Sequence, residues 1–302
     1  MTGNTIHQPA AVPKTVHPVM RVVMALIHDR LARFGLMTLA VFVLLALFAP
    51  LLSPQDPYDL MQLDIMDGRL APGAESMAGM TYWLGTDDQG RDLFSAILYG
   101  TRISLMVGFS SAVFALLIGA SLGLISAYVG GKTDATIMRI VDIQLSFPPI
   151  LIALILLAVL GQGVDKIILA LVVTQWAYYA RTIRGSALVE RRRSYVDAAR
   201  SMALSNRRIL FRHILPNCLA PLIVVATMRI AYAIMLEATL SFLGIGLPVT
   251  EPSLGLLIAN GFEYLMSGDY WISFFPGLTL LLLIVAINLV GDALRDILNP
   301  RN

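Results

Sequence analysis

Two charged residues stand inside a long apolar segment, residues 219–243, and both are of types that can relay protons or hold ions. Arg229 and Glu237 are eight residues apart, too far to bridge along one helix. A charge at membrane depth costs at least ~2.5 kcal/mol on insertion scales, so each should face protein or water and find a partner on another helix. Glu237 is therefore either a buried, satisfied acid or a residue on a translocation path or its gate. The sequence leaves both interpretations open.

Other groups that could hold a metal or a nucleotide fail on their spacing. The acids of residues 87–92 lack the alternating ligands and the terminal Glu of a calcium loop. Gly130-Gly131-Lys132-Thr133 lacks the Gly that a phosphate loop needs five positions earlier, where Ser126 stands. The four histidines are scattered, so no His/Cys ligand set or Ser–His–Asp arrangement can be proposed. No catalytic group, cofactor or metal is predicted, and any ATP must be hydrolysed by a partner.

The composition is that of a polytopic membrane protein. The chain has 302 residues, of which 57% are hydrophobic and 14% charged, and its mean hydropathy is +0.74. The net charge of +2 gives no indication of nucleic-acid binding. A single cysteine, Cys218, excludes an intrachain disulfide. These values predict an all-α integral membrane protein.

Six apolar segments are close to the roughly 20 residues that a bilayer-spanning helix needs. Pro148 and Pro149 should bend the third of them at mid-depth. Lys and Arg are in excess before the first segment and after the fourth, which puts both termini in the cytoplasm. The six predicted transmembrane helices are Leu36–Leu52, Ile103–Val129, Ile137–Leu160, Ile167–Ile183, Leu219–Leu243 and Phe274–Val290.

The predicted organisation follows from these segments. Residues 1–33 form a cytoplasmic N-terminal tail and 34–53 the first transmembrane helix. Residues 54–101 form an extracytoplasmic loop with a short helix that Thr86 or Asp87 caps. Residues 102–292 form a core of five helices that includes a cytoplasmic loop at 189–218, and 293–302 form a cytoplasmic tail.

Small residues recur every four positions in the second predicted span. They form a flat stripe that lets another helix backbone approach closely, within the bundle or across a subunit interface. The stripe consists of Ala115, Gly119, Gly123 and Ala127.

The cytoplasmic loop has the pattern of two short helices joined at Leu204-Ser205-Asn206. Its first half has an apolar face, and its surroundings are basic. Periodicity alone leaves two interpretations open, a knob that docks into a partner or an amphipathic helix on the lipid surface. The apolar face consists of Ala198, Ala199, Met202 and Ala203.

The spacing within this loop resembles the signature of ABC-importer permeases, which reads Glu-Ala-Ala, three residues, Gly, nine residues, Ile-x-Leu-Pro. Here it reads Asp197-Ala198-Ala199, three residues, Ala203, nine residues, His213-Ile214-Leu215-Pro216. Ala at the Gly position permits φ > 0 less readily, so a different turn or a longer first helix is expected.

Three further phrases resemble C-type permeases of the dipeptide/oligopeptide/nickel importer family. They are Gly85-Thr86-Asp87-Asp88-Gln89-Gly90-Arg91-Asp92, Ser241 to Gly246, and Gly291 to Pro300. Leu254 replaces a Trp of that family, a change expected at the outer mouth. The resemblance runs from about residue 34 to the C-terminus and implies the type I ABC-importer permease fold.

The resemblance implies a permease subunit of an ATP-driven importer for peptides or related small solutes in the bacterial inner membrane. Its implied partners are a homologous B-type permease, two ABC ATPase subunits, an extracytoplasmic substrate-binding protein and membrane lipid, without nucleic acid. The residues implied to couple to the ATPases are Asp197, Ala198, Ala199, Met202, Ala203, Leu215 and Pro216.

Two other classes of protein compete with this interpretation. An ion-coupled secondary transporter would use Glu237 and Arg229 as its relay. An intramembrane enzyme would need paired carboxylates, a Ser–Lys pair or a metal set at membrane depth, and none is evident. The identity of the solute is not readable from the sequence: dipeptides, oligopeptides, nickel chelates, glutathione, opines and oligosaccharides are all compatible.

Overall fold

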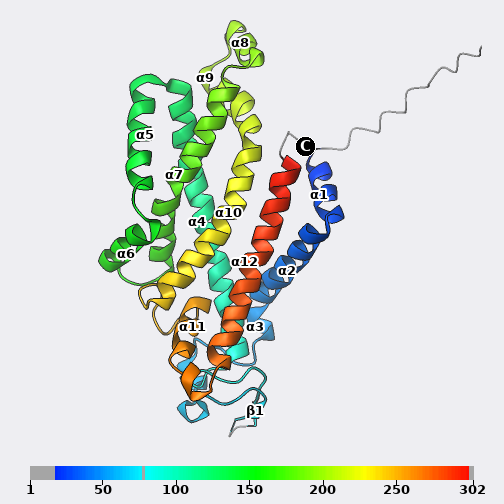
Figure 1. The fold of residues 1–302 in the computed structure, drawn as a ribbon, viewed down its shortest axis with the longest axis vertical. Helices are drawn as coiled ribbons and strands as arrows, with labels where there is room; N and C mark the ends of the chain where they lie inside the picture. The colour runs from blue at the N-terminus through cyan, green and yellow to red at the C-terminus, as the bar shows by residue number, and fades with distance from the viewer. Residues whose placement is uncertain (1–17, 77–78, 299–302) are drawn as a thin grey trace, which may run out of the picture.

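Long helices lie side by side and form the body of the molecule (Figure 1). The computed structural model describes residues 18–76 and 79–298. The longer helices are α1 (Pro18–His28), α2 (Arg30–Leu47), α4 (Leu93–Val129), α5 (Gly131–Leu145), α6 (Pro149–Leu160), α7 (Val164–Glu190), α10 (Leu219–Phe242) and α12 (Trp271–Leu298). The shorter ones are α3 (Ala49–Leu52), α8 (Ser194–Ser201), α9 (Asn206–Arg208) and α11 (Leu254–Phe262).

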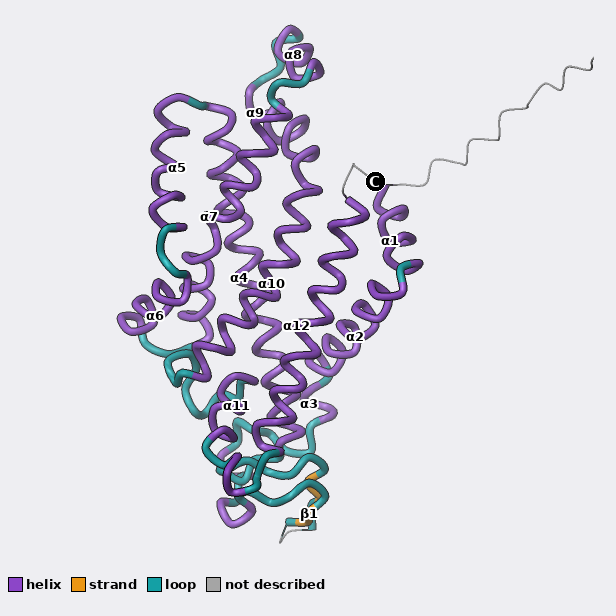
Figure 2. The backbone as a smooth tube through the Cα atoms, in the orientation of Figure 1, coloured by secondary structure: helices purple, strands orange, loops and turns teal. Residues whose placement is uncertain are grey.

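The two ends of the bundle differ in structure. α8 stands at one end, here called the α8 end, and α1 and the C-terminal end of α12 lie toward it (Figure 1). The opposite, β1 end holds η5 (Leu265–Ser267) and the segment between α3 and α4 with η1 (Leu60–Gln62) and η2 (Ile65–Asp67). Figure 2 shows there the antiparallel strands β1 (Ala74–Glu75) and β2 (Thr81–Tyr82), in which Ala74 pairs with Tyr82.

Four described helices are long and apolar enough to cross a membrane: α2, α4, the continuous helical path 206–242 and α12. α5 and α6 make a fifth if they are counted together. α7 is long enough at 27 residues, but polar residues such as Gln175, Arg181 and Arg184 lower its hydropathy. The number of six spans and the cytoplasmic side of both termini stay predictions.

The predicted bend at Pro148 and Pro149 is a complete break, because one helix ends before these prolines and another begins at them. α5 stops at Leu145 and α6 begins at Pro149, and the two axes differ by 88°. Proline has no N–H to donate, and the residue before it avoids the helical region. Pro148 accordingly has an extended backbone, with φ −58° and ψ 126°, and α6 starts anew.

The N-terminal part is more helical than predicted. Residues 18–28, placed in the polar tail 1–33, form α1, whereas residues 1–17 lie outside the described residues. α2 begins at Arg30, before the predicted boundary of 34–53, because Asp29 accepts a hydrogen bond from the Ala32 N–H at 2.7 Å and caps the helix. At the other end, α12 passes the predicted boundary of the 293–302 tail, and residues 299–302 are not described.

The short helix predicted to run into Tyr99 is not separate: it forms the first part of α4, so the second span starts earlier than predicted. α4 is one helix of 37 residues, capped by Asp92, which accepts from the Ser95 N–H at 2.8 Å. Thr86 and Asp87 do not cap a helix. The Asp87 carboxylate accepts instead from the N–H groups of Gln89 and Arg91, both at 2.9 Å, and closes a tight loop.

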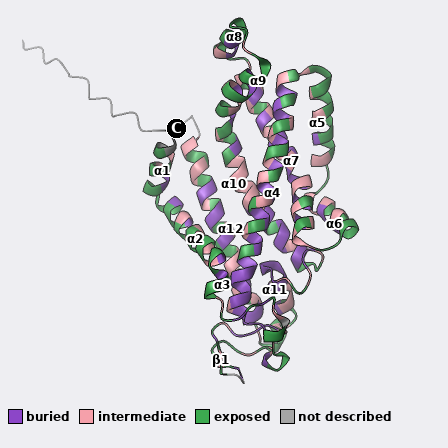
Figure 3. Ribbon diagram, turned by 180° about the vertical axis from the view of Figure 1, so that it is seen from behind, coloured by how far each residue is buried: buried purple, intermediate pink, exposed green. Residues whose placement is uncertain are grey.

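α4 and α7 pack closely because of small residues on α4. A Cβ added to Gly119 would lie 2.3 Å from the Trp176 carbonyl oxygen, and one on Gly123 would lie 2.2 Å from that of Ala180. Ala115 and Ala127 are buried in the same core. The small-residue stripe therefore packs within this chain, against α7. Figure 3 shows buried residues along α4 and α7, whereas α2 is largely exposed.

Candidate functional site

The first of the two predicted short helices is confirmed as α8, which projects from the α8 end (Figure 1), but the second is not a separate short helix, because α9 continues into α10. α8 follows α7 after a turn at Arg191–Arg193, and α9 begins at Asn206. From α9 the chain passes through a π-helical stretch, η3 (Ile209–Ile214), and a 3-10 stretch, η4 (Leu215–Cys218), directly into α10. Pro216 does not stop this helix. It lies in the first turn of η4, where a missing N–H is tolerated.

The turn after α8 keeps the left-handed geometry despite the absence of Gly. Ala203 has φ 55°, one of two positive φ values outside glycine in the described chain. The Leu204 N–H donates to the Ala199 carbonyl at 3.2 Å and the Ala203 N–H to that of Arg200 at 2.9 Å, which is the Schellman pattern. The expected different turn or longer first helix is therefore wrong, because these hydrogen bonds hold alanine in the position usually given to glycine.

The predicted apolar face of α8 divides into an inner and an outer part. Ala199 is buried with Val196 in a cluster that includes Ile209 and Ile214, so it holds α8 to the helix that follows. Ala198, Met202 and Ala203 are exposed, with Met202 at 73%, and Asp197 is exposed beside them. Leu215 is half-buried and Pro216 exposed in η4, away from this outer face. Of the predicted apolar face, only this outer part is available to a partner.

Tyr195 ties α8 to both helices that flank it. Its hydroxyl donates to the Glu190 carboxylate at 2.7 Å, at the end of α7, and accepts from the Asn217 amide at 3.1 Å, in η4. Burial and the Glu190 carboxylate raise the pKa of Tyr195 to about 12. The Tyr128 hydroxyl also lies 2.5 Å from Asn206 Oδ1, which joins the end of α4 to α9. α8 is thus fixed to α7 and η4, and α9 to α4.

Glu237 is fully buried between α4 and α10. Ser104 and Ser241 donate hydrogen bonds to its two carboxylate oxygens, each at 2.9 Å. Ser104 of α4 is the partner on another helix that the insertion cost demands, and Ser241 is a second partner on α10 itself. The geometry is that of a satisfied structural acid that joins two helices.

Arg229 does not meet Glu237. Its guanidinium lies over the Tyr178 ring, 3.4 Å from the centroid, and 5.4 Å from the centroid of Tyr232. These contacts are cation–π interactions. The two charges therefore have separate sets of partners, and the structure brings no relay together between them.

The segment before α4 is held at the β1 end by long-range hydrogen bonds of Gln55, Arg91 and Asp92, which were not predicted from the sequence and are here called the clasp. The Gln55 side chain accepts from the Asp92 N–H at 2.6 Å, and Arg91 Nη2 donates to the Val249 carbonyl at 2.8 Å. Burial raises the pKa of Asp87 to about 6, and Arg91 opposes this shift. Among the described residues no group of three or more His, Cys, Asp or Glu side chains could hold a metal ion.

Two family models cover most of this chain. Residues 119–302 match the binding-protein-dependent transport system inner membrane component, and residues 18–72 match the N-terminal TM domain of oligopeptide transport permease C. The chain belongs to the binding-protein-dependent transport permeases. It is therefore a multi-pass component of the inner membrane.

Two relatives of this permease match it over nearly their whole length. The dipeptide transport system permease protein DppC of Alkalihalophilus pseudofirmus is 38% identical over 90% of this chain and 86% of its own. The di/tripeptide transport system permease protein DppC of Pseudomonas aeruginosa is 37% identical over 99% of this chain and 98% of its own.

A solved structure shows the same fold. A chain of the MetNI methionine ABC transporter, in an inward-facing conformation, aligns with a TM-score of 0.56 and 22% identity, over 68% of this permease and 96% of that chain. At this identity the likeness concerns the fold alone, and it agrees with the expected type I importer architecture.

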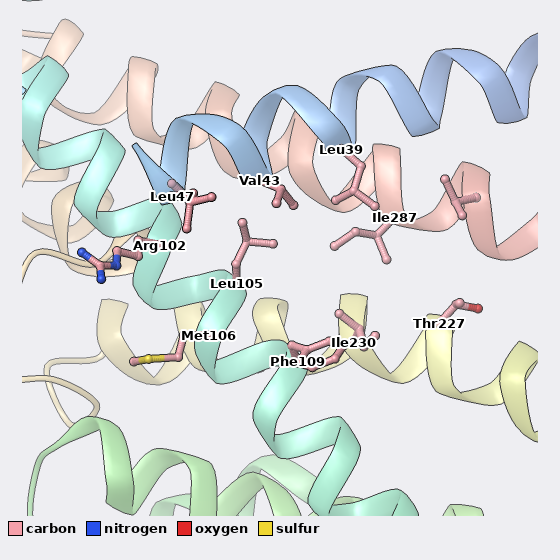
Figure 4. A pocket seen from close by; sticks show the side chains of 12 residues that line it. Leu39, Val43, Leu47, Arg102, Leu105, Met106, Phe109, Thr227, Ile230 and Ile287 are labelled. Carbon is pink, nitrogen blue, oxygen red and sulfur yellow. The ribbon is translucent and has the colours of Figure 1, made fainter. Parts of the chain in front are cut away.

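Two features of the permease were not predicted from the sequence: the burial of Leu254 and an apolar cavity between four helices. Leu254, expected at an outer mouth, is fully buried beside Trp271 and Leu93, so it forms no surface of this chain. An apolar cavity of 540 Å³ lies between α2, α4, α10 and α12, with Arg102 at its rim. Figure 4 shows Val43 of α2 and Leu105 of α4 facing each other across it.

Proposed function

We propose that this permease is the C-type subunit of an ATP-driven importer that moves peptides or related small solutes across the bacterial inner membrane. Its relatives named for dipeptides and di/tripeptides span the whole chain, which supports the solute class. Its partners would be a B-type permease, two ABC ATPase subunits that hydrolyse the ATP, and an extracytoplasmic substrate-binding protein. The family description, binding-protein-dependent transport, supports the last of these.

The observation that carries the coupling role is the build of α8. Its outer face presents Ala198 and Met202 beyond the bundle, with Asp197 and Arg200 at the edge. A short helix with an apolar face and a charged rim fits a groove on a partner protein. Because α8 is fixed to α7 and is followed by an unbroken helix into α10, a movement of the partner would tilt these two helices and switch the access of the pathway.

The orientation of the permease follows from its charges. The α8 end carries Arg191–Arg193, Arg200, Arg207 and Arg208, whereas the β1 end carries Asp56, Asp59, Asp64 and Asp67. Positive charge is retained on the cytoplasmic side. The α8 end would therefore face the cytoplasm and the ATPases, and the clasp would face the binding protein.

The ion-coupled alternative has less support. Its relay requires Glu237 and Arg229 to exchange charge, but Glu237 is enclosed by serine hydroxyls and Arg229 by tyrosine rings. It also assigns no role to the projecting α8. The family match favours the permease.

Met202→Glu tests the docking role in the assembled importer. A carboxylate on the outer face would be buried without a partner in an apolar groove, so we expect uptake and binding-protein-stimulated ATPase activity to fall at least tenfold, with the subunit still in the membrane. Ala199→Glu is a poorer probe, because Ala199 is buried within the permease itself.

Met202→Leu is the matched control, since it keeps an exposed apolar side chain at the same position of the outer face. It should transport like the wild type. Normal uptake by Met202→Glu would refute the docking role of α8.

A further inference from the structure

Two adjoining cavities lead from the α8 end toward the middle of the permease. The larger, of 760 Å³, is bounded by Thr182 of α7, Asn217 and Arg295 of α12. The smaller, of 450 Å³, is bounded by Tyr178, Arg229 and Tyr232, and by Pro149 at the break between α5 and α6. Val225 and Met228 line both cavities, so the two meet on the same face of α10.

Arg229 stands at the inner end of this path. It lies near the middle of α10, about 15 Å along the axis from Leu219 at 1.5 Å per residue. Its guanidinium lies over the Tyr178 ring, and the Tyr232 ring is the second aromatic contact. The rings contact the face of the guanidinium and fix its orientation, but they do not accept hydrogen bonds from its N–H groups, which point outward in the guanidinium plane.

The arginines nearest to it on α7 are neutralised, and Arg229 is not. Arg184 binds the Asp134 carboxylate through Nε at 2.5 Å, and Arg181 binds Asp142. Within residues 18–76 and 79–298, Arg229 makes no ion pair with a carboxylate. A cation held at membrane depth without an acid is costly, so its retention calls for an anion that comes and goes.

We infer that Arg229, positioned by Tyr178 and Tyr232, binds the carboxylate of the transported solute during its passage. The planar fork of a guanidinium matches a carboxylate with two parallel N–H···O bonds. Each of the two cavities is of the size that small ligands occupy. This inference rests on the proposed function and adds to it the end of the solute that the membrane part recognises.

The test compares one peptide with a free C-terminal carboxylate and the same peptide amidated, in liposomes that contain the whole importer and its binding protein. The measured quantity is the ratio of the saturating uptake rates of the acid and the amide. Any preference of the binding protein cancels when this ratio is compared between permease variants. If wild type imports neither form, the proposed function fails before the inference is reached.

Arg229→Gln should lower the acid-to-amide ratio at least tenfold, and Arg229→Lys, which keeps the charge but not the fork, should restore part of it. Arg102→Gln is the matched control, because Arg102 is an exposed arginine at the rim of the separate apolar cavity, and it should leave the ratio unchanged. If wild type accepts only the acid, a tenfold loss of acid uptake in Arg229→Gln but not in Arg102→Gln gives the same support.

Two outcomes would overturn the inference. An unchanged ratio in Arg229→Gln would mean that the solute carboxylate is not read here. Loss of the B-type subunit from the purified Arg229→Gln complex, with restoration by Arg229→Lys, would assign the missing carboxylate to the partner permease instead. Tyr178→Leu provides a second variant that keeps the charge and removes its platform, and it should lower the ratio less than Arg229→Gln does.

Discussion

At the scale of the residue, a side chain of this permease acts as its neighbours dictate. Ala203 adopts a backbone conformation that alanine rarely takes, because two Schellman hydrogen bonds hold it there. Glu237, a charged residue within an apolar segment, is stabilised by hydrogen bonds from two serine hydroxyls. For Arg229 the sequence predicted a partner on another helix, and the structure places Tyr178 of α7 and Tyr232 of its own helix beside it.

Glu237→Gln separates a structural acid from an ion relay. The amide oxygen can still accept from Ser104 or Ser241, so we expect uptake within about twofold of wild type, still dependent on ATP and insensitive to an ionophore. Glu237→Leu leaves both hydroxyls without their acceptor and should cost about 1–3 kcal/mol of stability, seen as a lower Tm. Loss of uptake in an intact, normally assembled Glu237→Gln importer would revive the ion-coupled mechanism.

At the scale of the element, the α4–α7 pair is the rigid core and the α5–α6 pair is a break. α4 approaches α7 so closely that the Gly123 position has no room for a methyl group. Pro149, by contrast, ends one helix and starts the next at an angle of 88°. The cavity at Arg229 opens where Pro149 leaves a space beside α7 and α10.

Gly123→Ala should destabilise the permease by about 1–3 kcal/mol, because its new Cβ would meet the Ala180 carbonyl oxygen at 2.2 Å and force the helices apart. The control is Gly185→Ala on α7, where no heavy atom lies within 4 Å of the added Cβ. That change should raise or preserve stability, since alanine favours a helix by ~1 kcal/mol over glycine. Thermal unfolding in detergent measures both, and equal Tm values would contradict the packing argument.

At the scale of the whole molecule, the distribution of charge predicts how the bundle is oriented in the membrane. Met202 marks the α8 end and Met266 the β1 end, both strongly exposed, whereas the native Cys218 is buried. An impermeant maleimide added to intact spheroplasts should label Met266→Cys at once and Met202→Cys only after permeabilisation. The reverse pattern would invert the assignment of the cytoplasmic side.

Hydropathy and spacing predicted much of this architecture, because long apolar runs and small-residue stripes report local physics. The short helix before Leu204 and the fifth span lie where they were expected, and the helix predicted over 103–129 is part of the longer α4. The clasp was missed because its contacts join segments far apart in the chain: Gln55 and Asp92 are 37 positions apart, and Arg91 and Val249 are 158 positions apart. The aromatic platform under Arg229 was missed for the same reason.

The helical path from Asn206 to Phe242 contains no irregular residue, although it changes from α to π to 3-10 and back to α. A flexible loop would absorb a small displacement of α8, but this continuous helix contains no loop that could do so. The π-helical and 3-10 turns differ in the number of residues per turn, so a pull along the helix axis would also twist the helix. A movement of a partner docked on α8 would therefore reach Arg229 as a rotation as well as a translation.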